Sequence, residues 1–298
     1  LQFVALSLAH LSQWLPGDYL DPGPLRFTSS FGIDEQNSPS GDFAVTLGNN
    51  DLSGDARIQG INLGKFPEFS VNPGEKIRIA GKFESSRLNL MEIFPPRKKP
   101  RQAPESQAAL FSNDPISVDW LQKFDLDATL QADDLVSRGF EAKGLSTDIA
   151  VADGVLDISA RSGEFSGGTF RMDIGLNTKT MPYTTDFKFD IKGLVLNRVP
   201  ALEDVKLPLE GAVDVAIDFS GRGVSPKEIV STASGSLLAR GVNTYLPASG
   251  LDVLTNSILA QVLSIGNPKK KSDFHRLDCG LLGFRVVDGI AMSRDTIA

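Results

Sequence analysis

The sequence predicts a mainly β fold: an elongated, curved antiparallel β-sheet that forms a groove, with a few short accessory amphipathic helices. Three observations lead to this prediction. Apolar and polar residues alternate with a period of two along much of the chain, Asp-Gly pairs separate alternating stretches, and helical periodicity is confined to short segments. The 298 residues are 41% hydrophobic and 22% charged, so the chain is globular and can bury a core.

The alternating stretches are each interpreted as one β-strand with one apolar side. They comprise residues 43–48, 56–61, 76–83, 125–132, 145–151, 155–160, 170–176, 186–196 and 212–219. Asp153-Gly154 and Asp288-Gly289 lie between such stretches and tolerate the positive φ angles of tight hairpins. Neighbouring strands are therefore expected to be chiefly antiparallel.

Helical periodicity is restricted to four places in the chain. They are residues 1–15, a short turn after Asp114-Pro115, residues 226–233 and residues 251–265. Ser225 is predicted as the N-cap of the third helix, with Pro226 at its first position. The apolar stripe of the fourth helix is expected to cap an end of the sheet, and plugging or gating of a groove is the alternative.

A Pro-rich and basic stretch without apolar periodicity divides the chain in sequence. We predict an N-terminal β-groove portion at residues 1–95, a flexible linker at residues 96–112 and a β module at residues 113–298. This module is expected to be truncated at its end, which makes the chain a fragment of a longer protein.

Composition and motifs argue against most kinds of chemistry. A formal net charge of -7 argues against nucleic acid as a partner. Cys279 is the only cysteine, and it is expected to be a buried residue beside a solvated His275 rather than half of a nucleophile pair. Neither metal-ligand spacing nor a phosphate-binding glycine motif is present. We therefore predict no catalytic residue, no metal and no cofactor.

So many one-sided strands leave the question of what covers their apolar sides. Two facing sheets, a closed barrel, or a trough that holds something other than protein would each answer it. Glycines within predicted strands favour a bent sheet; they are Gly48, Gly60, Gly175 and Gly193. Periodicity alone nevertheless favours a filled protein core over a groove.

Four segments decide in favour of the groove because they resemble the AsmA family of bacterial envelope proteins, which is related to TamB and to bridge-like lipid transfer proteins. The segments are residues 110–135, 151–170, 218–243 and 273–296. The resemblance implies a periplasmic body anchored in the inner membrane of a Gram-negative bacterium. It also implies a long β groove that shields phospholipid acyl chains on their way to the outer membrane.

From the resemblance and the alternation together we expect a non-enzymatic lipid carrier. Phospholipid, the inner membrane and, as candidates, outer-membrane proteins are its expected partners. The alternative is a scaffold of envelope assembly with a filled β core. The residues expected to line the groove are Phe170, Met172, Ile174, Phe187, Phe189, Ile191, Val213, Val215, Ile217 and Phe219.

Overall fold

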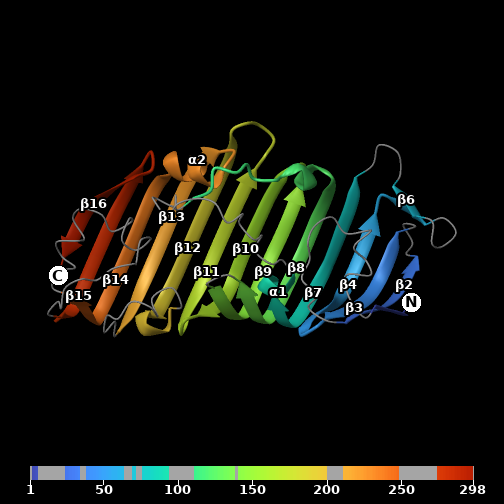
Figure 1. The fold of residues 1–298 in the computed structure, drawn as a ribbon, viewed down its shortest axis with the longest axis horizontal. Coiled ribbons are helices and arrows are strands. Elements are labelled where there is room, and N and C mark those ends of the chain that lie inside the picture. The colour runs from blue at the N-terminus through green and yellow to red at the C-terminus, as the bar shows by residue number, and fades with distance from the viewer. Residues whose placement is uncertain are drawn as a thin grey trace, which may run out of the picture. The chain divides into compact units, whose positions relative to one another are not determined.

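The structure is a computed structural model that describes residues 2–5, 24–33, 38–63, 69–71, 76–93, 111–137, 140–199, 211–247 and 274–297. It is a mainly β protein, and the predicted fold class is confirmed in this respect (Figure 1). The chain divides into two compact units, and each is described by itself.

Unit 1 consists of residues 1–104, 117–163 and 177–179. Its elements are β1 (Gln2–Ala5), β2 (Leu25–Ile33), β3 (Pro39–Leu47), β4 (Asn50–Gln59), β5 (Ile61–Leu63), β6 (Phe69–Val71), β7 (Ile77–Asn89), α1 (Leu90–Ile93), the 3₁₀ helix η2 (Asp119–Gln122), β8 (Phe124–Ser137), β9 (Phe140–Ala152) and most of β10 (Val155–Phe165).

Unit 2 consists of residues 105–116, 164–176 and 180–298. Its elements are β11 (Gly168–Asn177), β12 (Tyr183–Val195), the 3₁₀ helix η3 (Leu196–Arg198), β13 (Ala212–Gly223), α2 (Pro226–Ser231), β14 (Ser234–Pro247), β15 (Phe274–Val287) and β16 (Ile290–Ile297). The division predicted at residues 96–112 stays a prediction, because residues 94–110 lie outside the described part of the chain.

Strands that follow one another in sequence are mostly neighbours in the sheet. The order is β1-β2-β3-β4-β7-β8-β9-β10-β11-β12-β13-β14-β15-β16, an open series, while β5 and β6 pair separately. The pair β7 and β8 is parallel, from Ile77 opposite Phe124 to Asn89 opposite Val136. A parallel pair cannot be joined by a hairpin and needs a crossover connection between the end of β7 and the start of β8.

Two-residue turns with positive φ join several of the antiparallel neighbours. Asp153 and Gly154 have φ angles of 49° and 79°, and Asp288 and Gly289 have φ angles of 48° and 73°, which confirms both predicted hairpins. Ser166-Gly167 forms a third turn of the same kind, with φ angles of 48° and 83°. Asp and Ser occupy the first position in these turns, and Gly always occupies the second.

The predicted helix after Ser225 is confirmed with its cap. The Ser225 hydroxyl accepts a hydrogen bond from the Glu228 N–H at 3.3 Å, and Pro226 is the first helical residue. The Glu228 carboxylate accepts from the Val224 N–H at 2.9 Å, so the entry to α2 is bonded from both sides. The turn predicted after Asp114-Pro115 is η2.

The helix predicted at residues 1–15 is wrong for Gln2–Ala5, which form β1 and pair with Leu25–Thr28 of β2. Pairing with a neighbouring strand outweighed the local helical period in this short apolar stretch. The helix predicted at residues 251–265 lies outside the described residues. Among the described helices, none has the length and hydropathy that a membrane-spanning helix requires.

Few apolar side chains are fully buried. Among the residues whose burial is described, thirteen hydrophobic residues are buried, and five of them are alanines. Most large apolar residues of the strands remain partly exposed. The sheet therefore has an apolar side that other parts of the described protein do not cover completely.

Glycines opposite phenylalanines allow neighbouring strands of this sheet to approach closely. In unit 1, Gly54 of β4 lies between Phe43 of β3 and Phe83 of β7, whose ring centroids are 5.7 Å apart. A Cβ atom on Gly54 would lie 2.0 Å from the Lys82 carbonyl oxygen. The two rings meet across the glycine because no side chain separates them.

Gly54→Ala should lower the free energy of unfolding by about 1–3 kcal/mol, because the added methyl group would displace the backbone of β7. Gly32→Ala is the matched control, since nothing lies within 4 Å of the Cβ position on this strand glycine. Urea unfolding followed by circular dichroism measures both variants. Equal midpoints for the two variants would contradict this account of Gly54.

Candidate functional site: an apolar sheet face and a charged strand end

The predicted lining residues of β12 and β13 face each other across the two strands. The register joins Phe187 to Phe219, Phe189 to Ile217, Ile191 to Val215, and Leu194 to Val213. Residues directly opposite in an antiparallel pair have side chains on the same side of the sheet. The register therefore places these residues on one side of the sheet, as alternation predicts, and their role as a groove lining stays a prediction.

The same side continues across β14 and β15 of unit 2. Ile217 is opposite Leu237, and Leu237 is opposite Phe284. The neighbouring row continues from Val215 through Ala239 to Leu282 in the same way. We call this side of unit 2 the apolar face. The ten predicted lining residues lie on β11, β12 and β13 and do not include these residues of β14 and β15.

Burial differs among the ten predicted lining residues. Phe170 and Ile191 are 2% and 1% exposed, so they are covered by the protein itself. The other eight are partly exposed. The Phe189 ring is stacked on Phe170, with centroids 5.7 Å apart, and on Phe187, with centroids 6.4 Å apart. The apolar face thus has a filled section at Phe170 and Ile191 and more accessible sections beside it.

Unit 1 has an apolar face of its own that the predicted lining did not include. Ile58 of β4 is opposite Ile79 of β7, and Ile79 is opposite Leu126 of β8; all three are partly exposed. On the same side of β7 and β8, Gly81 opposite Ala128 and then Phe83 opposite Leu130 follow. The alternation in residues 76–83 and 125–132 carried this signal in the sequence.

The opposite side of the sheet carries the polar residues. Lys188 is opposite Asp218 on β12 and β13, with its Nζ atom 3.7 Å from the carboxylate. Asp214 accepts a hydrogen bond at 2.9 Å from the N–H of Gly193, which lies in a bulge between β12 and β13. Polar side chains therefore occupy this side of the sheet, and one of them hydrogen-bonds to the backbone at the bulge.

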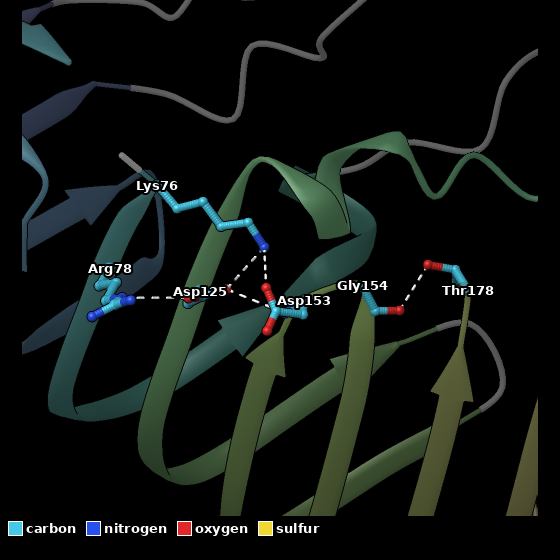
Figure 2. Close-up of polar contacts among 6 residues, drawn as sticks. All are labelled: Lys76, Arg78, Asp125, Asp153, Gly154 and Thr178. Atoms are coloured by element: carbon cyan, nitrogen blue, oxygen red, sulfur yellow. Dashed lines mark hydrogen bonds and ion pairs between the residues drawn. The ribbon is translucent and has the colours of Figure 1, made fainter. Parts of the chain in front are cut away.

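Four charged residues gather at one end of the strands of unit 1. We call Lys76, Arg78, Asp125 and Asp153 the rim cluster. Figure 2 shows Lys76 extending from the start of β7 to Asp153 in the turn between β9 and β10, with Asp125 beside them. The Lys76 Nζ atom lies 2.5 Å from Asp153 and 3.7 Å from Asp125, and the Arg78 Nε atom lies 3.5 Å from Asp125.

Neighbouring hydrogen bonds hold the turn that presents Asp153. The Gly154 N–H donates to the Leu121 carbonyl oxygen of η2 at 3.2 Å. The Gly154 carbonyl oxygen accepts from the Thr178 hydroxyl at 2.7 Å and from the Thr178 N–H at 2.9 Å (Figure 2). Thr178 itself is buried. The turn that carries Asp153 is therefore held by hydrogen bonds to η2 and to Thr178.

The rim cluster shifts the ionisation of its members. The hydrogen bond from Lys76, followed by the lysine charge, holds the pKa of Asp153 below its ordinary value. The hydrogen bond to Asp153 likewise raises the pKa of Lys76, and the charges of Asp153 and Asp125 add to the effect. Both residues are therefore charged across the neutral pH range.

Other residues considered in the sequence form no site in the described part of the chain. Cys279 is exposed, contrary to the prediction of a buried cysteine, because Gly280 and Leu282 hold the inward positions on β15 and Cys279 falls on the other side. The side chain of His275 is not among those described. No group of three or more His, Cys, Asp or Glu residues in the described ranges could hold a metal ion.

Comparison with known proteins identifies the family. A family model described as the AsmA family matches residues 73–293, which include the rim cluster and all ten predicted lining residues. The chain belongs to the AsmA family. This AsmA-family membership confirms the resemblance seen in the sequence and is consistent with a function associated with the bacterial envelope. AsmA is not a known enzyme family. No curated protein and no solved structure matched the chain.

In this AsmA-family chain, Lys76→Gln should raise the pKa of Asp153 toward its ordinary value of 3.8, because the hydrogen bond and charge that favour the carboxylate are lost. A pH titration of the Asp153 carboxyl resonance by NMR measures this shift. The folded-state pKa of Asp153 is lowered, so the ion pair stabilises the fold above the unfolded pKa, and this stabilisation is lost as the pH falls through the folded value. An Asp153 midpoint unchanged in the variant would contradict the pairing.

Proposed function

We propose that this protein is a non-enzymatic envelope protein that shields phospholipid acyl chains against its apolar sheet faces during transport between the inner and outer membranes. The observation that carries the proposal is the row of partly exposed apolar side chains in unit 2, from Phe189 through Ile217 and Leu237 to Phe284. Hydrocarbon is the chemistry that such a surface accommodates.

The free energy of acyl-chain burial explains why a carrier needs a long apolar surface. Each methylene group left in water costs about 0.8 kcal/mol, so a two-tailed lipid with about 30 methylene groups would face more than 20 kcal/mol in water. An open strand series offers apolar contact along successive strands and holds the tails at no single tight site. Such a surface lowers the cost without trapping the lipid.

The location and partners follow from the same proposal. A carrier of this kind acts in the periplasm, and we propose that it is anchored in the inner membrane of a Gram-negative bacterium. Phospholipid is then the cargo, and outer-membrane proteins are candidate partners at the receiving end. The family match supports an envelope protein, and the apolar faces support a lipid cargo.

Aspartate substitutions on the apolar face should weaken lipid binding. Phe189→Asp and Ile217→Asp each place a carboxylate on this face, and losing contact with about two methylene groups costs about 1.6 kcal/mol, roughly tenfold in affinity. A phospholipid with a photoreactive group in its acyl chain reports the change as crosslinking yield in the full-length protein. Unchanged crosslinking in both variants would show that these residues do not line the lipid path.

Two adjacent leucines of β14 provide a matched control. Leu237 lies on the apolar face opposite Ile217, whereas Leu238 lies on the polar side opposite Ala216 and is 45% exposed. Leu237→Asp should lower crosslinking, and Leu238→Asp should leave it unchanged. A reproducible protein partner together with no bound lipid would favour the alternative of an assembly scaffold.

A further inference from the structure

The rim cluster lies at one strand end of unit 1, beside the apolar face of that unit, with Arg78 and Asp125 on the polar side of the sheet. Lys76 directly precedes β7, and Asp153 lies in the turn that follows β9. The first apolar pair of this strand end is Ile77 opposite Phe124, and both side chains are partly exposed. At this end of the strands, charged and apolar residues are therefore one or two positions apart in sequence.

An exposed aromatic residue marks the same boundary. The Trp120 side chain of η2 is stacked on Phe124, with ring centroids 5.8 Å apart, and Trp120 is 41% exposed. Its indole N–H donates to the Ser117 carbonyl oxygen at 3.1 Å. Tryptophan favours the boundary between hydrocarbon and polar headgroups because its ring is apolar and its N–H is polar.

From these observations we propose that the rim cluster is a subsite for a zwitterionic headgroup that carries both a phosphate and an ammonium group. The inference rests on the proposed function and specifies which class of phospholipid is held there. Lys76 and Arg78 are the two cations that bind the phosphate. Asp125 and Asp153 are the two carboxylates that bind the ammonium group.

The balance of charges selects the headgroup class. Two cations and two carboxylates leave the cluster formally neutral, so a ligand with one group of each sign finds a partner for both. A headgroup with a phosphate and no ammonium would take Lys76 and Arg78 from Asp125 and Asp153 and leave these two carboxylates without a cation. Zwitterionic lipids should therefore be preferred over anionic lipids with the same tails.

A cavity beside the cluster provides the space for such a group. Its volume is about 440 Å³, and Arg78 and Asp125 are among the residues that line it. Most of its lining residues lie on the polar side of the sheet. The small side chains of the exposed residues Ala80, Ala150 and Ala152 leave space there. The cavity thus lies on the polar side of unit 1, and a headgroup in it would pass over the strand end while its tails remain on the apolar face of the same unit.

A ligand can replace the ion pairs that the four residues of the rim cluster make with one another. Lys76 and Asp153 have side-chain exposures of 35% and 71%, and Arg78 has 68%. Exposed ion pairs contribute little net free energy, so opening them costs little. A phosphate at Lys76 and an ammonium group at Asp153 would replace each broken contact with one of the same kind.

The experiment compares two lipids with identical acyl chains on the full-length protein. Vesicles of phosphatidylethanolamine and phosphatidylglycerol, mixed in equal amounts, are incubated with the protein, and the bound lipids are counted by mass spectrometry. We expect at least threefold more ethanolamine lipid than glycerol lipid on the wild-type protein. Asp125→Asn together with Asp153→Asn should reverse the preference, because two cations then remain without carboxylates.

Two further variants keep the result interpretable. Lys76→Gln should lower binding of both lipids, since each carries a phosphate. Asp218→Asn removes the carboxylate of the Lys188 pair on the polar side of unit 2, where both side chains are 62% exposed, and should leave the ratio unchanged.

The outcomes separate this inference from the proposed function. An equal ratio of the two lipids on the wild-type protein, unchanged in the aspartate double variant, would overturn the headgroup subsite and leave lipid carriage intact. Absence of both lipids from the wild-type protein would overturn the proposed function itself. Circular dichroism identifies a variant that fails to fold, and the wild-type ratio together with Lys76→Gln then decides the question.

Discussion

The structure depends on cross-strand registration of apolar side chains on one side of an open sheet. In unit 2 the row from Phe189 to Phe284 crosses four strands without a polar interruption, and Lys188 and Asp218 face the other way. A slip of one residue would bring the charged set to the apolar face. Register is therefore fixed even though few side chains are fully buried.

Local irregularities preserve this arrangement along strands of ten to fourteen residues. Between β12 and β13, the bulge at Lys192-Gly193 resets the phase, so that Ile191 and Leu194 both pair with apolar partners. On β9, the buried residues Ala142 and Leu145 are three positions apart, and Gly144 between them has a φ of 56°. Glycine makes these resets possible because it accepts positive φ without steric cost.

The sequence was sufficient for the fold class, the two Asp-Gly hairpins and the side of the sheet shared by the apolar residues of β12 and β13, because alternation and Asp-Gly turns are local signals. Two features were beyond its reach. The parallel pairing of β7 with β8 depends on a connection that was interpreted as a domain linker. The rim cluster depends on that pairing, which brings Lys76 to Asp153, 77 positions away in sequence.

Burial was also difficult to predict from one sequence. Phe170 and Ile191 alternate like their neighbours, yet they are buried, and the Phe170 ring is stacked on Phe189. Cys279 was assigned to the core because cysteine usually is buried, whereas the register places it on the polar side. Alternation gives the side of a sheet, and only neighbouring strands determine how far each side chain is covered.

The central claim is that hydrocarbon from a bound lipid completes the apolar faces. Native mass spectrometry of the full-length protein, purified without detergent exchange, tests it most directly. The account predicts additional masses that match one or more phospholipids and disappear after extraction with organic solvent. A single mass equal to that of the polypeptide, with no lipid in the extract, would contradict it.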